Sequence, residues 1–239
     1  MSEGVRAIEG GSLVDRAVRC VRDHIRDNKL KVGDTLPGEG AFAEQLGVSR
    51  AVMREAFSTL AALRQIDVGN GRKARVAAID GSVLSTSLDH AVATAQVTVA
   101  DIWDVRRTLE LRTAELAAVR RSDAEARAIL DHAEAMAAHG DDLDELTRHD
   151  IAFHQAIARA SGNALFYTII RSFEALMTVA VPTAWHARTT AEQRAMVIEQ
   201  HRRLAEAITN RDTAAAVAEM NIHFDTAIAD LFARSSAAI

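Results

Sequence analysis

The sequence contains few of the residues that crosslink chains or interrupt helices. It has one cysteine, Cys20, two prolines and 12 glycines among 239 residues. A single cysteine excludes a disulfide framework within the chain, which fits a reducing compartment. The scarcity of proline and glycine favours helices joined by short connections. Aromatic residues make up only 4% of the chain, so we expect an aliphatic, alanine-rich core.

Long apolar segments are also absent. No run approaches the ~18 consecutive apolar residues that a membrane-spanning helix needs. Residues 1–11 are polar and lack the apolar segment of a signal peptide. We therefore expect a cytoplasmic protein with no membrane partner.

Charge of either sign is modest and unevenly distributed. The net charge is −5, but residues 1–80 carry 13 basic and 11 acidic side chains. An acidic total argues against general binding of nucleic acid, whereas a local basic surface on the first third suits contact with phosphates. The length fits two domains, at roughly 100–200 residues each.

Helical patterns dominate the first third. Apolar spacing predicts a helix over residues 12–28, where valines and Ile25 surround Cys20, and we expect that thiol to be buried and inert. Two further helices, residues 39–46 and 50–64, are separated by a short turn. Gly47 is typical of the position after a helix, and Ser49 of an N-cap. This arrangement is a helix-turn-helix.

The second of these helices and the segment after it carry basic residues in a form that suits DNA. Arg50 and Arg54 are four residues apart, so they project from one face near the helix N-terminus. In helix-turn-helix proteins that end meets base edges in the major groove, where arginine can hold guanine. Residues 66–76 then predict two short strands around a basic turn, the wing of a winged helix. Its candidate DNA contacts are Asn70, Gly71, Arg72, Lys73 and Arg75.

The segment LKVGDTLPGEGAFAEQLGVSRAVMREAF, residues 30–57, resembles the GntR family of bacterial regulators. The resemblance implies a winged helix-turn-helix over residues 1–78 that binds operator DNA through Ser49, Arg50, Arg54 and the wing. Three positions depart from the family pattern. Gly40 stands where relatives often have arginine, while Lys73 and Arg64 replace glycines. The docking mode therefore carries over, but the operator sequence does not.

The rest of the chain predicts helices only. After a linker or connecting helix over residues 79–97, residues 98–239 predict an antiparallel all-helical bundle. The fold class is therefore mostly α. Its helices are expected over residues 88–95, 98–121, 122–139, 141–161, 163–180, 189–210 and 211–234, with a break near Pro182.

Four polar residues lie on apolar helix faces in this region. Asp150 and His154 are one turn apart, so both can face one ion. His201 and His223 each share a face with apolar residues of other helices. One divalent ion could satisfy all four, because unpaired buried imidazoles and carboxylates are costly. Taken alone, each histidine is better interpreted as an ordinary core or surface residue, and Asp150 and His154 as a hydrogen-bonded pair on one helix. The remaining histidines are interpreted as surface or linker residues.

The segments DVRRTLELRTAELAA, DIAFHQAIARASGNAL and EQHRRLAEAI resemble the FCD effector domain of FadR-like GntR regulators, over roughly residues 98–234. With the four residues above, this resemblance favours a bound Zn, Ni, Mn, Co or Fe ion. Arg106 lies on the apolar stripe of its helix and is suited to gripping the carboxylate of a small organic acid. A salt bridge to an acid such as Glu110 is the alternative.

The leading hypothesis is therefore a homodimeric repressor whose grip on DNA responds to a small acidic metabolite at a metal site. A purely structural metal, or metal as the signal itself, are alternatives. A metalloenzyme with a DNA-binding appendage is the rival of a different class. The sequence has no HExxH motif and no phosphate-binding glycine loop, and no obvious general base accompanies the ligands, so an enzyme is not expected.

Overall fold

The computed structural model describes residues 11–69 and 71–235, with side chains described as far as residue 227. It divides into two compact units at Val83 and Leu84. The described residues are mostly helical, as the sequence predicts, and their only two strands form one short hairpin.

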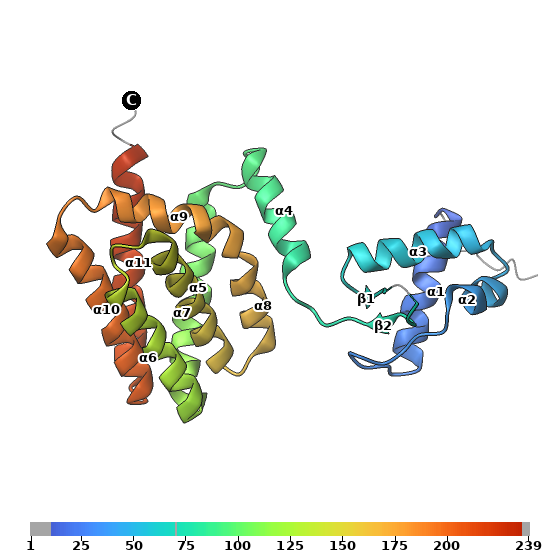
Figure 1. The fold of residues 1–239 in the computed structure, drawn as a ribbon, viewed down its shortest axis with the longest axis horizontal. Helices are drawn as coiled ribbons and strands as arrows, with labels where there is room; N and C mark the ends of the chain where they lie inside the picture. The colour runs from blue at the N-terminus through green and yellow to red at the C-terminus, as the bar shows by residue number, and fades with distance from the viewer. Residues whose placement is uncertain (1–10, 70, 236–239) are drawn as a thin grey trace, which may run out of the picture. The chain divides into compact units, whose positions relative to one another are not determined.

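The first unit contains three helices and the hairpin (Figure 1). Its elements are α1 (Leu13–Asp27), α2 (Glu39–Leu46), α3 (Arg50–Ala62), β1 (Ile66–Asp67) and β2 (Arg75–Val76). A separate core, which includes Phe42, Met53 and Leu60, holds the three helices together. This confirms the winged helix-turn-helix fold.

Local sequence signals determine the turn between α2 and α3. Gly47 ends α2 in the left-handed conformation, with φ of 69°, which glycine adopts without steric cost. The hydroxyl of Ser49 then accepts a hydrogen bond from the Val52 amide at 3.2 Å and caps α3. The Cys20 side chain is only half-buried, so the expectation of a buried thiol is wrong.

The wing is an antiparallel pair in which Ile66 lies opposite Val76 and Asp67 opposite Arg75. A bridge from Arg75 to Thr35 extends the pairing to the loop before α2. Asn70, predicted at the wing tip, lies outside the described residues.

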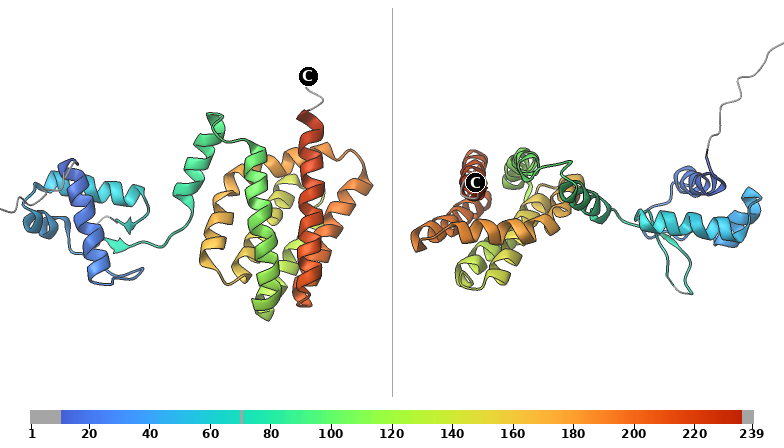
Figure 2. Two further views of the ribbon diagram at one scale, coloured as in Figure 1. Left: turned by 180° about the vertical axis from the view of Figure 1, so that it is seen from behind. Right: turned by 90° about the horizontal axis from the view of Figure 1, so that it is seen from above.

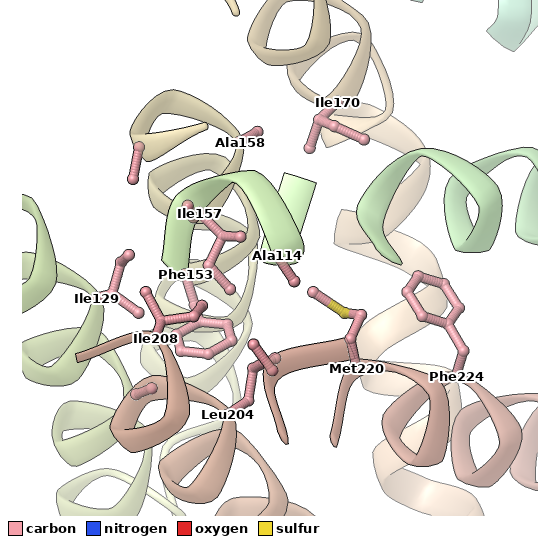
Figure 3. Close-up of a cluster of buried hydrophobic side chains, with 14 of the residues drawn as sticks. Ala114, Ile129, Phe153, Ile157, Ala158, Ile170, Leu204, Ile208, Met220 and Phe224 are labelled. Carbon is pink, nitrogen blue, oxygen red and sulfur yellow. The ribbon is translucent and has the colours of Figure 1, made fainter. Parts of the chain in front are cut away.

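The second unit is an antiparallel helical bundle (Figures 1 and 2). Its helices are α4 (Ser82–Ala93), α5 (Val99–Arg120), α6 (Asp123–Ala138), α7 (Leu143–Ala160), α8 (Ala164–Ser172), α9 (Glu174–Ala187), α10 (Ala191–Thr209) and α11 (Thr213–Ser235). Helix α5 packs on α7 and α11, and α10 packs on α6 and α11. The core between them is aliphatic and alanine-rich, with Phe153 and Phe224 among its few aromatic side chains (Figure 3).

Several helix boundaries differ from the sequence-based expectation. The helix expected over residues 88–95 begins earlier, at Ser82, and ends at Ala93 as α4. The single helix expected over residues 163–180 is broken at Phe173, where α8 and α9 meet at 59°. Pro182, expected to end a helix, lies inside α9. Proline lacks an N–H to donate, but its restricted φ is compatible with helical backbone. Packing against other helices can therefore stabilise a helix that has a proline in its interior.

Among the described residues, no single helix has the length and apolar character to cross a membrane, and only the bent pair α8 and α9 passes such a test on length and composition.

Candidate nucleic-acid interface and metal centre

The two arginines of the predicted recognition helix are exposed at the start of α3. The Arg54 side chain is 74% exposed, and its Nε lies 3.8 Å from Oε2 of Glu39. An exposed ion pair of this kind contributes at most about 1 kcal/mol. Both guanidinium groups are therefore accessible to a partner surface such as a DNA groove.

Gly40, one of the departures from the family pattern, lies directly beneath Arg50. A Cβ atom added to Gly40 would lie 3.7 Å from Nε and Nη2 of Arg50. The missing side chain thus leaves room for the Arg50 guanidinium to fold over the start of α2. A larger residue at position 40 would have to share this space with Arg50.

The turn between the two strands of the wing presents a short basic surface. Gly71, Arg72 and Lys73 are exposed, and Gly71 has a φ of 69° that favours glycine. Arg75 is exposed as well, but its Nη1 donates to the Gly33 carbonyl at 2.6 Å. Arg75 therefore ties the wing to the preceding loop with part of its guanidinium.

The second unit brings together three histidines from three helices. His154 lies on α7, His201 on α10 and His223 on α11, and all three are buried. One nitrogen from each lies within 4.8 Å of the others, a spacing that could hold one metal ion. The His201 and His223 ring centroids are 4.6 Å apart.

Asp150, the fourth predicted ligand, joins this cluster through His201. Oδ1 of Asp150 lies 3.1 Å from Nε2 of His201. Burial opposes ionisation of Asp150, but the hydrogen bond with His201 and the charges of the histidines outweigh it and hold the pKa of Asp150 far below its usual range. Burial, reinforced by the neighbouring histidine charges, lowers the pKa of His223 well below the usual value. The group thus offers an ionised carboxylate and an imidazole that stays neutral near pH 7.

The hydrogen-bond partners of His201 indicate whether the histidine cluster and Asp150 can accept a cation. Its Nδ1 lies 2.8 Å from the carbonyl oxygen of Val197, which can only accept, so Nδ1 carries the hydrogen. In a neutral ring, Nε2 then turns a lone pair toward the Asp150 carboxylate. A second proton on the ring or a bound cation removes this repulsion. Imidazole and carboxylate ligands together suit a first-row divalent ion.

Arg106 and Glu110 form a buried ion pair beside the histidines. Arg106 is 4% exposed and Glu110 is 1% exposed, and Nε of Arg106 donates to Oε1 of Glu110 at 2.8 Å. The other oxygen, Oε2, contacts Nδ1 of His154. Burial alone would raise the pKa of Glu110. The charges of Arg106 and His154 together outweigh this effect and hold the pKa of Glu110 below its usual value. The alternative expected for Arg106, a salt bridge to Glu110, is thus present.

Arg106 also lines a cavity of about 40 Å³ with the four predicted metal ligands. Its guanidinium carbon lies 4.9 Å from the centre of the Trp103 ring, a cation–π contact that holds the side chain inward. The Trp103 indole nitrogen is buried without a hydrogen-bond partner among the described residues. Salt bridge and cavity wall are therefore compatible roles for Arg106.

Sequence reasoning missed part of this cavity. Arg188, which follows α9, is 6% exposed and lines it, as does Trp185. No periodic pattern marks a residue beyond a helix end, so only the packing of α9 reveals Arg188. The half-buried His132 and His149 correct the interpretation of the remaining histidines as surface residues, because their Nδ1 atoms meet 3.1 Å apart between α6 and α7.

Profiles of two protein families match the chain. Residues 13–76 match "Bacterial regulatory proteins, gntR family". Residues 101–226 match "FCD domain". The first match contains α1 to α3 and the wing, and the second contains the histidine cluster and Arg106.

Several relatives match most of the chain. The chain is 32% identical over 196 residues to the "Glc operon transcriptional activator" of Escherichia coli strain K12, covering 78% of this chain and 76% of that protein. It is 30% identical over 203 residues to the "HTH-type transcriptional regulator LutR" of Bacillus subtilis strain 168, covering 83% and 92%. It is 25% identical over 208 residues to the "Galactonate operon transcriptional repressor" of E. coli K12, covering 84% and 89%. These proteins are named as transcription regulators, not as enzymes.

A solved structure supports the fold independently. The GntR protein of Streptococcus agalactiae superposes with a TM-score of 0.68 at 23% identity, over 89% of this chain and 97% of that one.

Proposed function

Because this chain belongs to the GntR family of bacterial transcription regulators and carries an FCD domain, we propose that it is a repressor controlled by a small organic acid bound at a divalent metal. In this proposal a cytoplasmic homodimer binds operator DNA. Occupation of the bundle cavity by the acid weakens that binding.

One observation carries the effector half of the proposal: a buried arginine and the four predicted metal ligands line the same small cavity. A metal held by Asp150, His154, His201 and His223 would supply a Lewis-acidic position for a carboxylate oxygen. Arg106 can supply a charge-assisted hydrogen bond to the same group. The small volume of the cavity, about 40 Å³, favours an acid of few heavy atoms.

The DNA half of the proposal relies on the exposed face of α3 and on the wing. Arg50 and Arg54 would contact base edges, with Ser49, Gly71, Arg72, Lys73 and Arg75 against the backbone or minor groove. A dimer places two such units on half-sites about one helical turn apart. A ligand can shift the dimer between two arrangements only through its different affinity for each.

Genome-wide binding of the purified protein tests this function directly. Sheared DNA from the source organism is captured with full-length protein at about 50 mM and about 200 mM salt, because phosphate contacts alone lose most of their affinity over this range. We expect a few enriched sites with two-fold symmetry that persist at the higher salt. Weak, sequence-blind capture that disappears at the higher salt would refute the proposal.

The captured site then reports on the acid and the metal. We expect zinc-loaded protein to release the site when one acid from a panel of small hydroxy-, keto- and dicarboxylic acids is added. Chelation should abolish this response while the bundle stays folded. Unfolding on chelation, with no selective loss of acid binding, would indicate a purely structural metal. A response to the ion alone would make the metal the signal.

For the direction of regulation, one observation favours a second candidate, activation instead of repression. The Galactonate operon protein is named a repressor, whereas the Glc operon protein, at 32% identity, is named an activator. A promoter–reporter fusion carrying the captured site distinguishes them. Repression predicts that deletion of the regulator raises reporter output, and activation predicts that it lowers it.

A further inference from the structure

Glu110 of α5 is the most deeply buried acidic side chain near the histidine cluster, at 1% exposure. Its two carboxylate oxygens have different partners. Oε1 accepts from Nε of Arg106 at 2.8 Å, and Oε2 contacts Nδ1 of His154 across the gap between α5 and α7. One carboxylate therefore links the arginine of the effector cavity to a candidate metal ligand.

The contact determines which nitrogen of His154 carries the hydrogen. Because Glu110 is paired with the Arg106 guanidinium, its carboxylate acts as an acceptor, so Nδ1 of His154 donates to Oε2. In the neutral ring this leaves the lone pair on Nε2, the nitrogen remote from Glu110 and free to face His201 and His223. Metal-bound histidines commonly donate their second N–H to such an acceptor, which orients the ring and raises its basicity.

The comparison with His201 shows why Glu110 is informative. His201 has the same tautomer, but its Nδ1 donates to a backbone carbonyl, that of Val197. No side-chain substitution removes that acceptor. His201 also contacts the acidic side chain of Asp150, but Asp150 is itself a predicted ligand, whereas the acidic partner of His154 is not.

We propose that Glu110 is a positioning residue of the metal centre, which holds His154 in the tautomer that binds the ion and joins that ligand to Arg106. This inference rests on the proposed metal site. It assigns Glu110 no direct contact with the metal or the acid. It also implies that one carboxylate, that of Glu110, contacts both a residue of the metal site and a residue of the acid site.

Substitution of Glu110 by glutamine makes the inference testable, because the two side chains have nearly the same shape. The amide has only one oxygen. If that oxygen accepts from Arg106, the amide N–H₂ faces His154 and favours a lone pair on Nδ1, which moves the hydrogen to Nε2. If the oxygen faces His154, the N–H₂ opposes a guanidinium that can only donate. Either arrangement disturbs the metal ligand or its neighbour.

The primary experiment measures zinc affinity of full-length protein by competition with a chromophoric chelator. We expect Glu110→Gln to bind Zn²⁺ about 10- to 100-fold more weakly than wild type, the usual effect of losing such an outer partner. The matched control is Glu115→Gln, which neutralises a partly exposed acid of the same helix that pairs with Arg112. We expect this control to bind zinc within about threefold of wild type.

The outcomes separate the inference from the function on which it rests. Equal zinc affinity in Glu110→Gln and wild type overturns the role of Glu110 and leaves the metal site standing. Wild-type protein that binds no zinc overturns both the metal site and its positioning residue.

A second measurement does not depend on the folding of Glu110→Gln. Long-range ¹H–¹⁵N NMR spectra of metal-free wild-type protein distinguish the two neutral tautomers of histidine, with His154 assigned through a His154→Gln sample. We expect His154 to carry its hydrogen on Nδ1. A hydrogen on Nε2 alone overturns the proposal, whatever the stability of Glu110→Gln.

Discussion

Nε2 of His201 lies 3.1 Å from Oδ1 of Asp150, although the other nitrogen of the same ring already bonds to the Val197 carbonyl at 2.8 Å. The two side chains belong to α10 and α7 and are 51 residues apart in sequence. In a neutral ring this geometry places two acceptors face to face in the protein interior. A divalent ion bound by both groups would replace this repulsion with favourable coordination, and the first prediction follows from this.

Replacing His201 by alanine should remove most of the bound metal, because one of four predicted ligands is lost. Elemental analysis of protein purified without added chelator gives the metal content per chain. His90→Ala is the matched control, since His90 is exposed on α4 and lines no part of the cavity. Equal metal content in wild type and His201→Ala would exclude His201 as a ligand.

Replacing Arg50 or Arg54 by alanine should weaken specific operator binding by about 1–3 kcal/mol each, the usual value of an arginine contact with a base. Fluorescence anisotropy with the captured operator site, at constant salt, measures the effect. Arg203→Ala removes an exposed arginine from α10 and controls for net charge. If neither α3 variant differs from this control, the recognition helix has been assigned wrongly.

Replacing Arg106 by methionine should lower the free energy of unfolding by about 3–5 kcal/mol, because Glu110 is left buried without its cationic partner. Neighbouring Arg107 provides the control. Its ion pair with Asp225 is partly exposed, so Arg107→Met should cost no more than about 1 kcal/mol. Urea denaturation of metal-free protein compares the two. Similar losses of stability in both variants would show that the buried ion pair contributes no more than the partly exposed one.

The metal-free protein should lose stability as the pH falls from about 7.5 to 5.5. Burial lowers the pKa of His223 well below its usual value, so the folded state resists a proton that the unfolded chain accepts near pH 6.5. Below that pH the unfolded state binds more protons, and stability rises with pH through this window. Urea midpoints at three pH values test this. His223→Gln should show a shallower dependence, and an unchanged slope would contradict the assignment.

The DNA-binding half of the molecule was the more predictable from sequence. Gly47 and Ser49 act through the backbone of their own turn, so their effect on α2 and α3 is local and visible in the chain. The same holds for the hairpin around Gly71. Gly40 was recognised as a departure, but its position under Arg50 depends on how two helices pack.

The bundle was predictable in class but not in all its boundaries. Apolar periodicity indicates helices correctly, yet it could not place the break at Phe173 or the continuation of α9 through Pro182. Both depend on contacts with other helices. His154, His201 and His223 were singled out because each interrupts an apolar face, and the structure brings these three together. Their role as ligands stays a prediction.

The sequence alone determined the winged helix-turn-helix, the helical bundle and the kinds of side chain available for chemistry, because caps, turns and apolar periodicity act over a few residues. Only the tertiary structure decided that Glu110 meets His154, 44 residues away, and that Arg188 reaches the same cavity. Such contacts depend on the crossing and register of separate helices, which arise from packing of the whole core and which no local pattern encodes.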